Sequence, residues 1–153
     1  MNLRLAIEDM YKNAIKSKKT NETNTLRLIK SAIKDKDIAS RSLNNRDGIG
    51  DSEILSVLQN LIKQRKDSID SFKKALREDL VSIEQEEILI ISQFLPQQLN
   101  NAETEAVITK IISNNKLESL KDMGVLMNQL KSAHSGKIDM ALAGKIAKSK
   151  LSN

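Results

Sequence analysis

The chain has 153 residues, a formal net charge of +5, 39% apolar and 2% aromatic residues, and no cysteine. This length suits one domain or two small ones, and the lack of cysteine excludes disulfides and cysteine-type zinc sites. The first residues, MNLRLAIEDMYK, have the pattern of an amphipathic helix rather than of a signal peptide. The longest apolar run, Ile88–Ile91, is far shorter than the roughly 20 residues that span a bilayer. We therefore expect a cytoplasmic protein without a membrane span.

In the first part of the chain, apolar residues recur every three or four positions, which is the spacing of amphipathic helices. The pattern predicts four helices, over about residues 3–15, 21–40, 52–76 and 79–95. Between the second and third, Arg41–Ser52 contains Asn-Asn, Asp-Gly and a second glycine, which predicts an exposed, mobile loop. Asp51 or Ser52 is expected to cap the helix that follows.

Pro96 ends this helical pattern, because the residue before a proline is biased away from the helical region. The chain is therefore predicted to consist of two parts, residues 1–95 and 96–153, with three shorter helices in the second. No segment has the alternation of a strand, so we expect an all-α fold, with a four-helix N-terminal region and a three-helix C-terminal domain. The predicted caps of the C-terminal helices are Asn100 with Glu103, Ser119 with Asp122, and Asp139.

Positive charge is in excess toward the C-terminus. Residues 1–100 contain 17 Lys and Arg against 15 Asp and Glu, whereas residues 101–153 contain 8 against 5. A basic face favours polyanions such as RNA, and a solubilising surface is the alternative. Lys137 precedes the last predicted helix, whose N-terminal amides could seat a phosphate, and glycines allow close backbone approach. The candidate RNA contacts are Lys131, Lys137, Lys145, Lys148, Lys150, Gly124 and Gly136.

A second polar cluster, Lys63-Gln64-Arg65-Lys66, interrupts the apolar stripe of the third predicted helix. Arg65 falls on or beside the core-facing side, where we expect it to pair with Glu84 or Glu87. Lys63 and Lys66 stay open as exposed contacts to a partner or a phosphate.

The residue types leave little basis for catalysis. Glu84 with Glu87, and Asp67 with Asp70, are three positions apart and share a helix face. Such pairs can hold a divalent ion or act as general acid and base, but we expect these carboxylates simply to form part of a solvated helix face. His134, beside Ser-Gly, is expected to be a surface turn residue. The sequence therefore predicts no catalytic residues, no metal site and no cofactor.

Several motifs in order resemble the YqeY family: KQRKDSI at residues 63–69, LPQQL at 95–99, DMG with Met127 three positions later, and GKID at 136–139. This resemblance implies an all-α protein with a C-terminal domain similar to the tail of the B subunit of the tRNA-dependent amidotransferase. In that enzyme the tail helps to hold tRNA and does no chemistry. Related domains are appended to some glutaminyl-tRNA synthetases.

The resemblance implies an accessory tRNA-binding protein without chemistry of its own. Two alternatives stay open: an adaptor that docks on an aminoacyl-tRNA synthetase or amidotransferase, and a carbon–nitrogen ligase that uses glutamine as amido donor. The oligomeric state stays open too. The sequence departs from the family pattern at three places. Ala75-Leu76 stands where a glycine usually joins two long helices, Val125 where a lysine commonly follows DMG, and Met140 where a glycine is usual.

Overall fold

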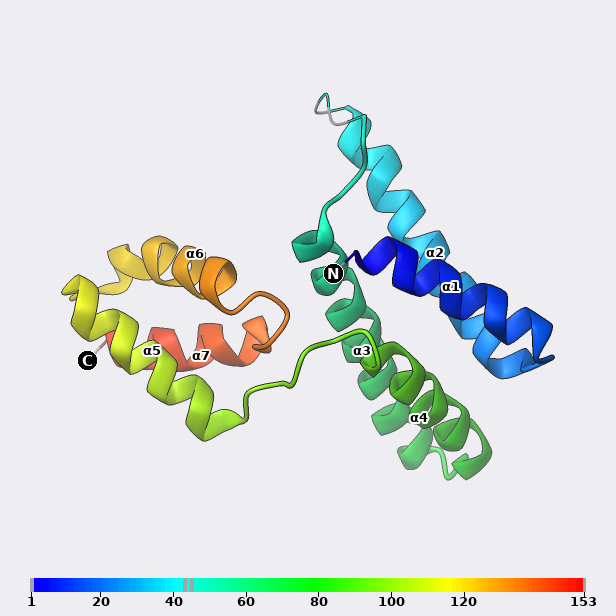
Figure 1. Ribbon diagram of the computed structural model, residues 1–153. Coiled ribbons are helices and arrows are strands. Elements are labelled where there is room, and N and C mark those ends of the chain that lie inside the picture. The colour runs from blue at the N-terminus through cyan, green and yellow to red at the C-terminus, as the bar shows by residue number, and fades with distance from the viewer. Residues whose placement is uncertain (1, 43, 45, 153) are drawn as a thin grey trace. The chain divides into compact units, whose positions relative to one another are not determined.

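The computed structural model describes residues 2–42, 44 and 46–152. Within these residues the chain forms seven α-helices and one short 3₁₀ helix, η1, and no strand, which confirms the predicted all-α fold (Figure 1). The elements are α1 (Leu3–Lys16), α2 (Thr20–Arg41), α3 (Asp51–Lys74), α4 (Glu78–Ser92), α5 (Asn101–Asn115), η1 (Leu120–Asp122), α6 (Met123–Ala133) and α7 (Met140–Leu151).

The helices form two compact units, Met1–Leu95 and Pro96–Asn153, which we call the N-terminal and C-terminal units. None of the described helices combines the length and the apolarity that a bilayer crossing requires.

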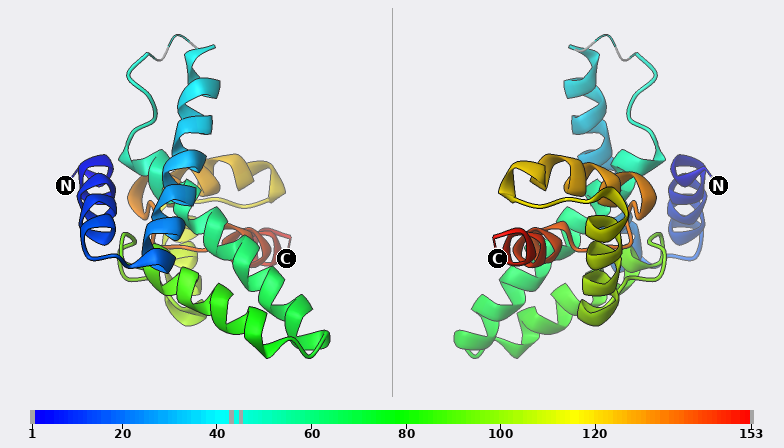
Figure 2. Two further views of the ribbon diagram at one scale, coloured as in Figure 1. Left: turned by 90° about the vertical axis from the view of Figure 1, so that its right-hand side faces the viewer. Right: turned by 90° about the vertical axis from the view of Figure 1, so that its left-hand side faces the viewer.

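In the N-terminal unit, α1 packs against α2 and α3 packs against α4, so the unit consists of two helical hairpins (Figure 2). The core is aliphatic, in keeping with the low aromatic content. Branched aliphatic side chains fill the space between helices in few rotamers, so such a core can be close-packed without aromatic rings. Its fully buried members include Ile7, Leu26, Ile29, Ile54, Leu58 and Ile91.

The C-terminal unit has a smaller aliphatic core between α5, α6 and α7, and its helix starts are capped as the sequence predicts. The Glu103 backbone N–H donates to Asn100 Oδ1 at 2.8 Å, and the Glu103 side chain accepts from the Asn100 N–H. A second capping box joins Ser119 and Asp122 at η1, and Asp139 Oδ1 accepts from the first amides of α7. The core residues are Ile108, Leu126, Leu130, Ile138, Ala143, Ala147 and Leu151.

The end of the loop between α2 and α3 is anchored, in contrast to the expectation of an exposed, mobile segment over residues 41–52. Asp37 accepts hydrogen bonds from both terminal nitrogens of Arg4 and, at 2.8 Å, from the Ile49 N–H. Arg4 also donates to the Ile49 carbonyl at 2.9 Å, and Ile49 is only 4% exposed. At Gly48, with φ +87°, a Cβ would lie 2.6 Å from Asp37 Oδ1, so only glycine fits there. Leu43 and Asn45 of this loop lie outside the described residues.

The predicted cap of α3 is wrong. Gly50 is the N-cap residue and contributes no side-chain hydrogen bond, and Asp51 is already the first helical residue. Asp51 Oδ1 accepts from the Leu3 N–H at 3.3 Å instead. The carboxylate therefore joins the start of α1 to the start of α3, a contact between distant parts of the sequence that local pattern does not indicate.

Three helices end in Schellman turns whose left-handed residue is not glycine. Lys18, Leu76 and Lys116 have φ of 56°, 56° and 52°. After α3, the Arg77 N–H donates to the Phe72 carbonyl at 2.9 Å and the Leu76 N–H donates to the Lys73 carbonyl at 3.1 Å. This is the paired hydrogen bonding of a Schellman motif, in which glycine is usual. The corner between α3 and α4 is thus a sharp break even though it contains no glycine.

Replacing Leu76 with glycine is expected to stabilise the N-terminal unit by about 0.5–1 kcal/mol, because a left-handed backbone costs a side-chain-bearing residue more than it costs glycine. Leu76 is 86% exposed, so its removal forfeits little packing. Leu76→Ala is the matched control, since it shortens the side chain but keeps the unfavourable backbone. Urea unfolding of both variants measures the difference. A Leu76→Gly variant less stable than Leu76→Ala would contradict this account.

Asp37→Asn is expected to lower the free energy of unfolding by about 1–3 kcal/mol near neutral pH, because it removes a charge-assisted pair with Arg4. The hydrogen bonds from Arg4 lower the pKa of the Asp37 carboxyl against the opposing effect of burial. Its stabilising effect is therefore present above the unfolded-state pKa and is lost as the pH falls through the lower folded-state value. The gap between wild type and variant should close in acid. Asp35→Asn, an exposed change on the same helix, is the control, and a gap independent of pH would refute the assignment.

Candidate nucleic-acid interface

The most uniformly basic part of the C-terminal unit is the pair of helices α6 and α7. Together they contain four lysines and no Asp or Glu. Lys131, Lys145 and Lys148 are exposed and make no salt bridge within the described part of the chain. Their positive charge is therefore available to a ligand rather than neutralised by the protein.

Helical geometry explains why the lysines of α7 face outward. Ala143 and Ala147 are fully buried, and at about 100° per residue Lys145 lies on the opposite side of the helix. Lys148 follows Lys145 by three positions and so shares the outer side with it. The small alanines let α7 approach the core closely, while the lysines stay in water.

Lys131 reaches the surface next to the contact between α6 and α7. A Cβ at position 144 would lie 4.0 Å from Met127 Cε, so Met127 and Gly144 mark where the two helices meet. Lys131 follows Met127 by one turn and Lys148 follows Gly144 by one turn. Both lysines therefore flank this contact, each on its own helix.

Lys150 differs from the other three lysines. Its ammonium lies 3.2 Å from Glu105 Oε1 on α5, and its side chain is 30% exposed. It helps to attach α7 to α5, and part of its charge is balanced by Glu105.

The start of α7 is occupied by the protein's own carboxylate. Asp139 Oδ1 accepts from the Ala141 N–H at 3.0 Å and from the Leu142 N–H at 3.3 Å. These are the amides that a phosphate would need, so the cap fills the expected phosphate seat. The Lys137 side chain is exposed, while its carbonyl accepts from the Leu99 N–H at 2.8 Å.

The two glycines among the candidate contacts lie in different environments. Gly136 is buried with φ +74°, and its carbonyl accepts from Gln98 Nε2, so it closes the turn between α6 and α7 and is not part of the exposed face. Gly124 is exposed on α6, and a Cβ there would meet no described atom within 4 Å. Close helix packing therefore does not explain Gly124, and its backbone is open to a ligand.

In the N-terminal unit the structure confirms that Arg65 pairs with an acid. Arg65 Nε donates to Glu87 Oε2 at 2.7 Å, and its Nη1 donates to the Leu61 carbonyl at 3.0 Å. Burial raises the pKa of Glu84, and the nearby Glu87 carboxylate raises it further. Lys63 and Lys66 are exposed.

Among the described residues, the carboxylate pairs Glu84/Glu87 and Asp67/Asp70 do not belong to a larger metal-binding group. Asp67 and Asp70 are exposed, and Glu87 is engaged by Arg65. Among the described residues no group of three or more His, Cys, Asp and Glu side chains is placed to hold a metal ion. His134 is half-buried at the C-cap of α6, where its backbone N–H donates to the Leu130 carbonyl.

A second basic region was missed because charge was counted over the whole N-terminal part. Residues 2–41, which span α1 and α2, contain ten Lys and Arg against five Asp and Glu, a net charge of +5. Residues 51–92, which span α3 and α4, contain six against nine, a net charge of −3. The opposite charges of the two hairpins largely offset each other in the total for residues 1–100, which is only +2. The net charge of each predicted hairpin taken by itself would have indicated the basic one.

Three fungal proteins show what the chain is similar to. An uncharacterized protein of Schizosaccharomyces pombe is 32% identical over 100 residues, which cover 65% of this chain and 77% of that protein. Altered inheritance of mitochondria protein 41, mitochondrial, is 34% identical in Kluyveromyces lactis, over 72% of this chain and 59% of that protein, and 33% identical in Lachancea thermotolerans, over 69% and 55%. The chain thus spans little more than half the length of these two mitochondrial relatives.

The family comparison covers nearly the whole chain. The model of the family described as Yqey-like protein matches residues 4–151, which include nearly all of both units and every described α-helix except the first residue of α1. The match includes the motifs around Arg65, Pro96, Gly124 and Asp139 that resemble this family. The chain belongs to the YqeY family.

Proposed function

We propose that this protein is an accessory RNA-binding protein whose C-terminal unit holds tRNA through the outer face of α6 and α7, without chemistry of its own. The observation that supports this most directly is the unbalanced charge of those helices, four lysines without a carboxylate. The proposed contacts are Lys131, Lys145 and Lys148, with Lys137 beside them, and the resemblance of this domain to the amidotransferase tail supports tRNA as the ligand.

The side chains on this face favour contact with the phosphate backbone over reading of bases. The C-terminal unit contains no Phe, Tyr or Trp, and its one imidazole, that of His134, is half-buried, so few rings are available to stack on an unpaired base. Lysine is a flexible point charge that suits phosphate oxygens. Binding of this kind follows the shape and charge of the RNA and falls steeply with salt.

We propose that this activity takes place in the cytoplasm, a reducing compartment that suits a chain without cysteine. Two relatives are named as mitochondrial proteins, so an organellar tRNA is the other ligand to test.

Changing Lys145 and Lys148 to glutamate should weaken tRNA binding by about tenfold or more, because two phosphate contacts are replaced by repulsion. The slope of log affinity against log salt should become shallower by at least about 1.4. Fluorescence anisotropy of labelled tRNA at several salt concentrations measures both quantities.

The matched control is Lys73→Glu with Lys74→Glu, which changes the net charge by the same amount at the end of α3. This control should bind tRNA almost as wild type does. Equal losses in both variants would mean that only total charge matters, and no binding by the wild type at low salt would reject the proposal.

A second candidate function, docking on an aminoacyl-tRNA synthetase or amidotransferase, is favoured by a groove in the N-terminal unit. The groove lies between the α1–α2 turn and α4, has a volume of about 520 Å³, and is lined in part by Met10, Leu89 and Ile90. Leu89 is 68% exposed, and a large apolar side chain in such a position can serve as an anchor for a partner.

If this groove binds such an enzyme, Leu89→Gln should weaken the complex by about tenfold, since an apolar anchor typically contributes more than 1 kcal/mol. Leu28→Gln, at another exposed leucine of the N-terminal unit, is the control. Calorimetric titration with the purified synthetase and amidotransferase would decide it, and the absence of heat with both enzymes removes this candidate.

A further inference from the structure

We infer that the α1–α2 hairpin forms a second phosphate-binding groove, which takes the backbone of a nucleic acid along α2 through Arg27 and Lys34. This inference deepens the proposed function, because it assigns the same class of ligand to a second surface. It rests on residues of the N-terminal unit alone, so it can fail or stand separately.

The groove between the two helices is a defined feature of the hairpin. It has a volume of about 330 Å³ and is lined from α1 by Arg4, Glu8 and Tyr11. From α2 it is lined by four charged residues, Arg27, Lys30, Lys34 and Asp37. Four cations and two carboxylates therefore face one concave surface, which leaves an excess of two positive charges.

The pairing within the groove identifies which cations are left for a ligand. Arg4 is engaged by Asp37, and the Lys30 ammonium lies 2.8 Å from Glu8 Oε2. These two pairs use both carboxylates, and the hydrogen bond to Lys30 lowers the pKa of Glu8, which keeps that acid ionised. Arg27 and Lys34 are exposed and make no salt bridge to any described residue.

Tyr11 lies in the groove between these charges. The Lys30 ammonium lies 4.2 Å from the centroid of its ring, and Arg27 Nη2 donates to its hydroxyl at 3.5 Å. Tyr11 is neutral, so neither contact balances the charge of Arg27. Arg27 and Lys34 are seven positions apart, two turns of α2, so they stand roughly 10 Å apart along one side of the helix.

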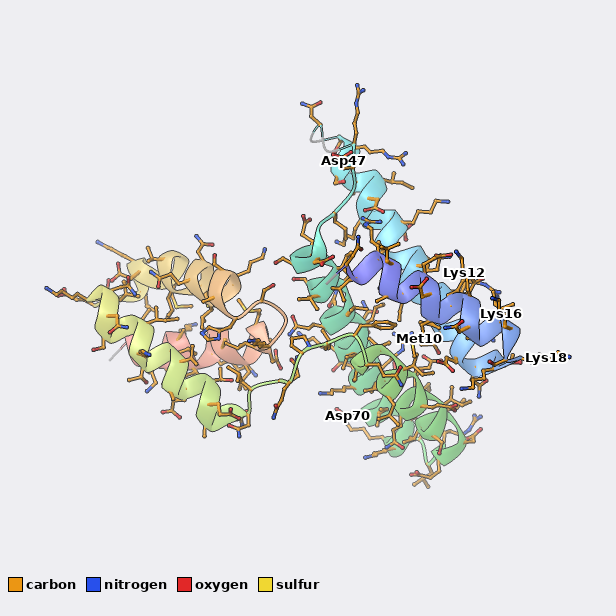
Figure 3. All side chains as sticks on the ribbon, in the orientation of Figure 1. Met10, Lys12, Lys16, Lys18, Asp47 and Asp70 are labelled. Carbon is orange, nitrogen blue, oxygen red and sulfur yellow. The ribbon has the colours of Figure 1, made fainter. Side chains whose placement is uncertain are left out.

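Two cations spaced along a helix suit an extended ligand better than a small one. A single phosphate could contact only one of these two cations, whereas a polynucleotide strand carries phosphates at regular intervals and could contact both. The neighbouring surface is basic as well: Lys12, Lys16 and Lys18 lie along the second half of α1 and the turn after it (Figure 3), and no Asp or Glu occurs between residues 10 and 21. We favour a nucleic acid over a membrane, because the unpaired charges line a concave groove and an anionic bilayer would need them on a convex face.

The test is tRNA binding by the full chain carrying Arg27→Ala and Lys34→Ala. We expect affinity to fall by about tenfold and the salt slope to become shallower by about 1.4–1.8, as for two lost phosphate contacts. Alanine is a better helix former than either residue, so the fold should persist, and a thermal melt checks this. Lys73→Ala with Lys74→Ala, at the end of α3, removes the same charge elsewhere and should leave binding unchanged.

The outcomes separate this inference from the proposed function. Loss of binding in the α2 variant supports the groove whether or not Lys145 and Lys148 matter, and normal binding overturns it even if those lysines are essential. Equal losses in the α2 variant and in the α3 control also overturn it. Vesicles of phosphatidylcholine with phosphatidylserine, and inorganic phosphate, are the competing probes. Loss of vesicle or phosphate binding with tRNA binding unchanged would mean that the groove serves another ligand.

Discussion

The carboxylate of Asp37 joins three separate parts of the N-terminal unit. It accepts from Arg4 on α1, lies on α2, and accepts from the Ile49 N–H just before α3. Without it, a guanidinium and a backbone amide would lose their partner in a half-buried place, a cost typical of a broken charged pair. Arg4 and Asp37 both line the groove between α1 and α2, so this contact helps to shape that groove. Because Arg4 and Asp37 neutralise each other, the remaining cations of the groove define its charge.

Charge is distributed unevenly along the chain. The α1–α2 hairpin is positive, the α3–α4 hairpin is negative, and α6 with α7 contains no acid at all. Solubility alone does not require this segregation of charge, since a surface with both signs interspersed is equally soluble. Segregation does matter for a polyanionic ligand, because clustered cations raise both the rate and the strength of association. The two proposed surfaces therefore share one physical rationale.

Local features of the sequence predicted the helices and most of their caps, whereas most contacts between distant residues could not be predicted. The helices, the break at Pro96, the capping box of Asn100 and the cap at Asp139 all depend on residues within one turn of each other. Pairing of Arg65 with Glu84 or Glu87 was predicted because a cation in an apolar stripe needs a partner, and the structure shows that the partner is Glu87. By contrast, Ile49 is buried through Arg4 and Asp37, 45 and 12 positions away, and nothing local indicates it. The left-handed backbone at Leu76 could not be predicted either, because no glycine stands at this position.

The most direct test of the central claim, that phosphate backbone binds the unpaired cations of two surfaces, is a lysine footprint. Exposed lysines of the full chain are modified by a small amine-reactive reagent with and without tRNA, and protection is read by mass spectrometry. We predict protection of Lys34, Lys131, Lys145 and Lys148, and unchanged reactivity of Lys63, Lys66, Lys73 and Lys74 on α3. Protection strongest on α3, or no protection at low salt, would contradict the account.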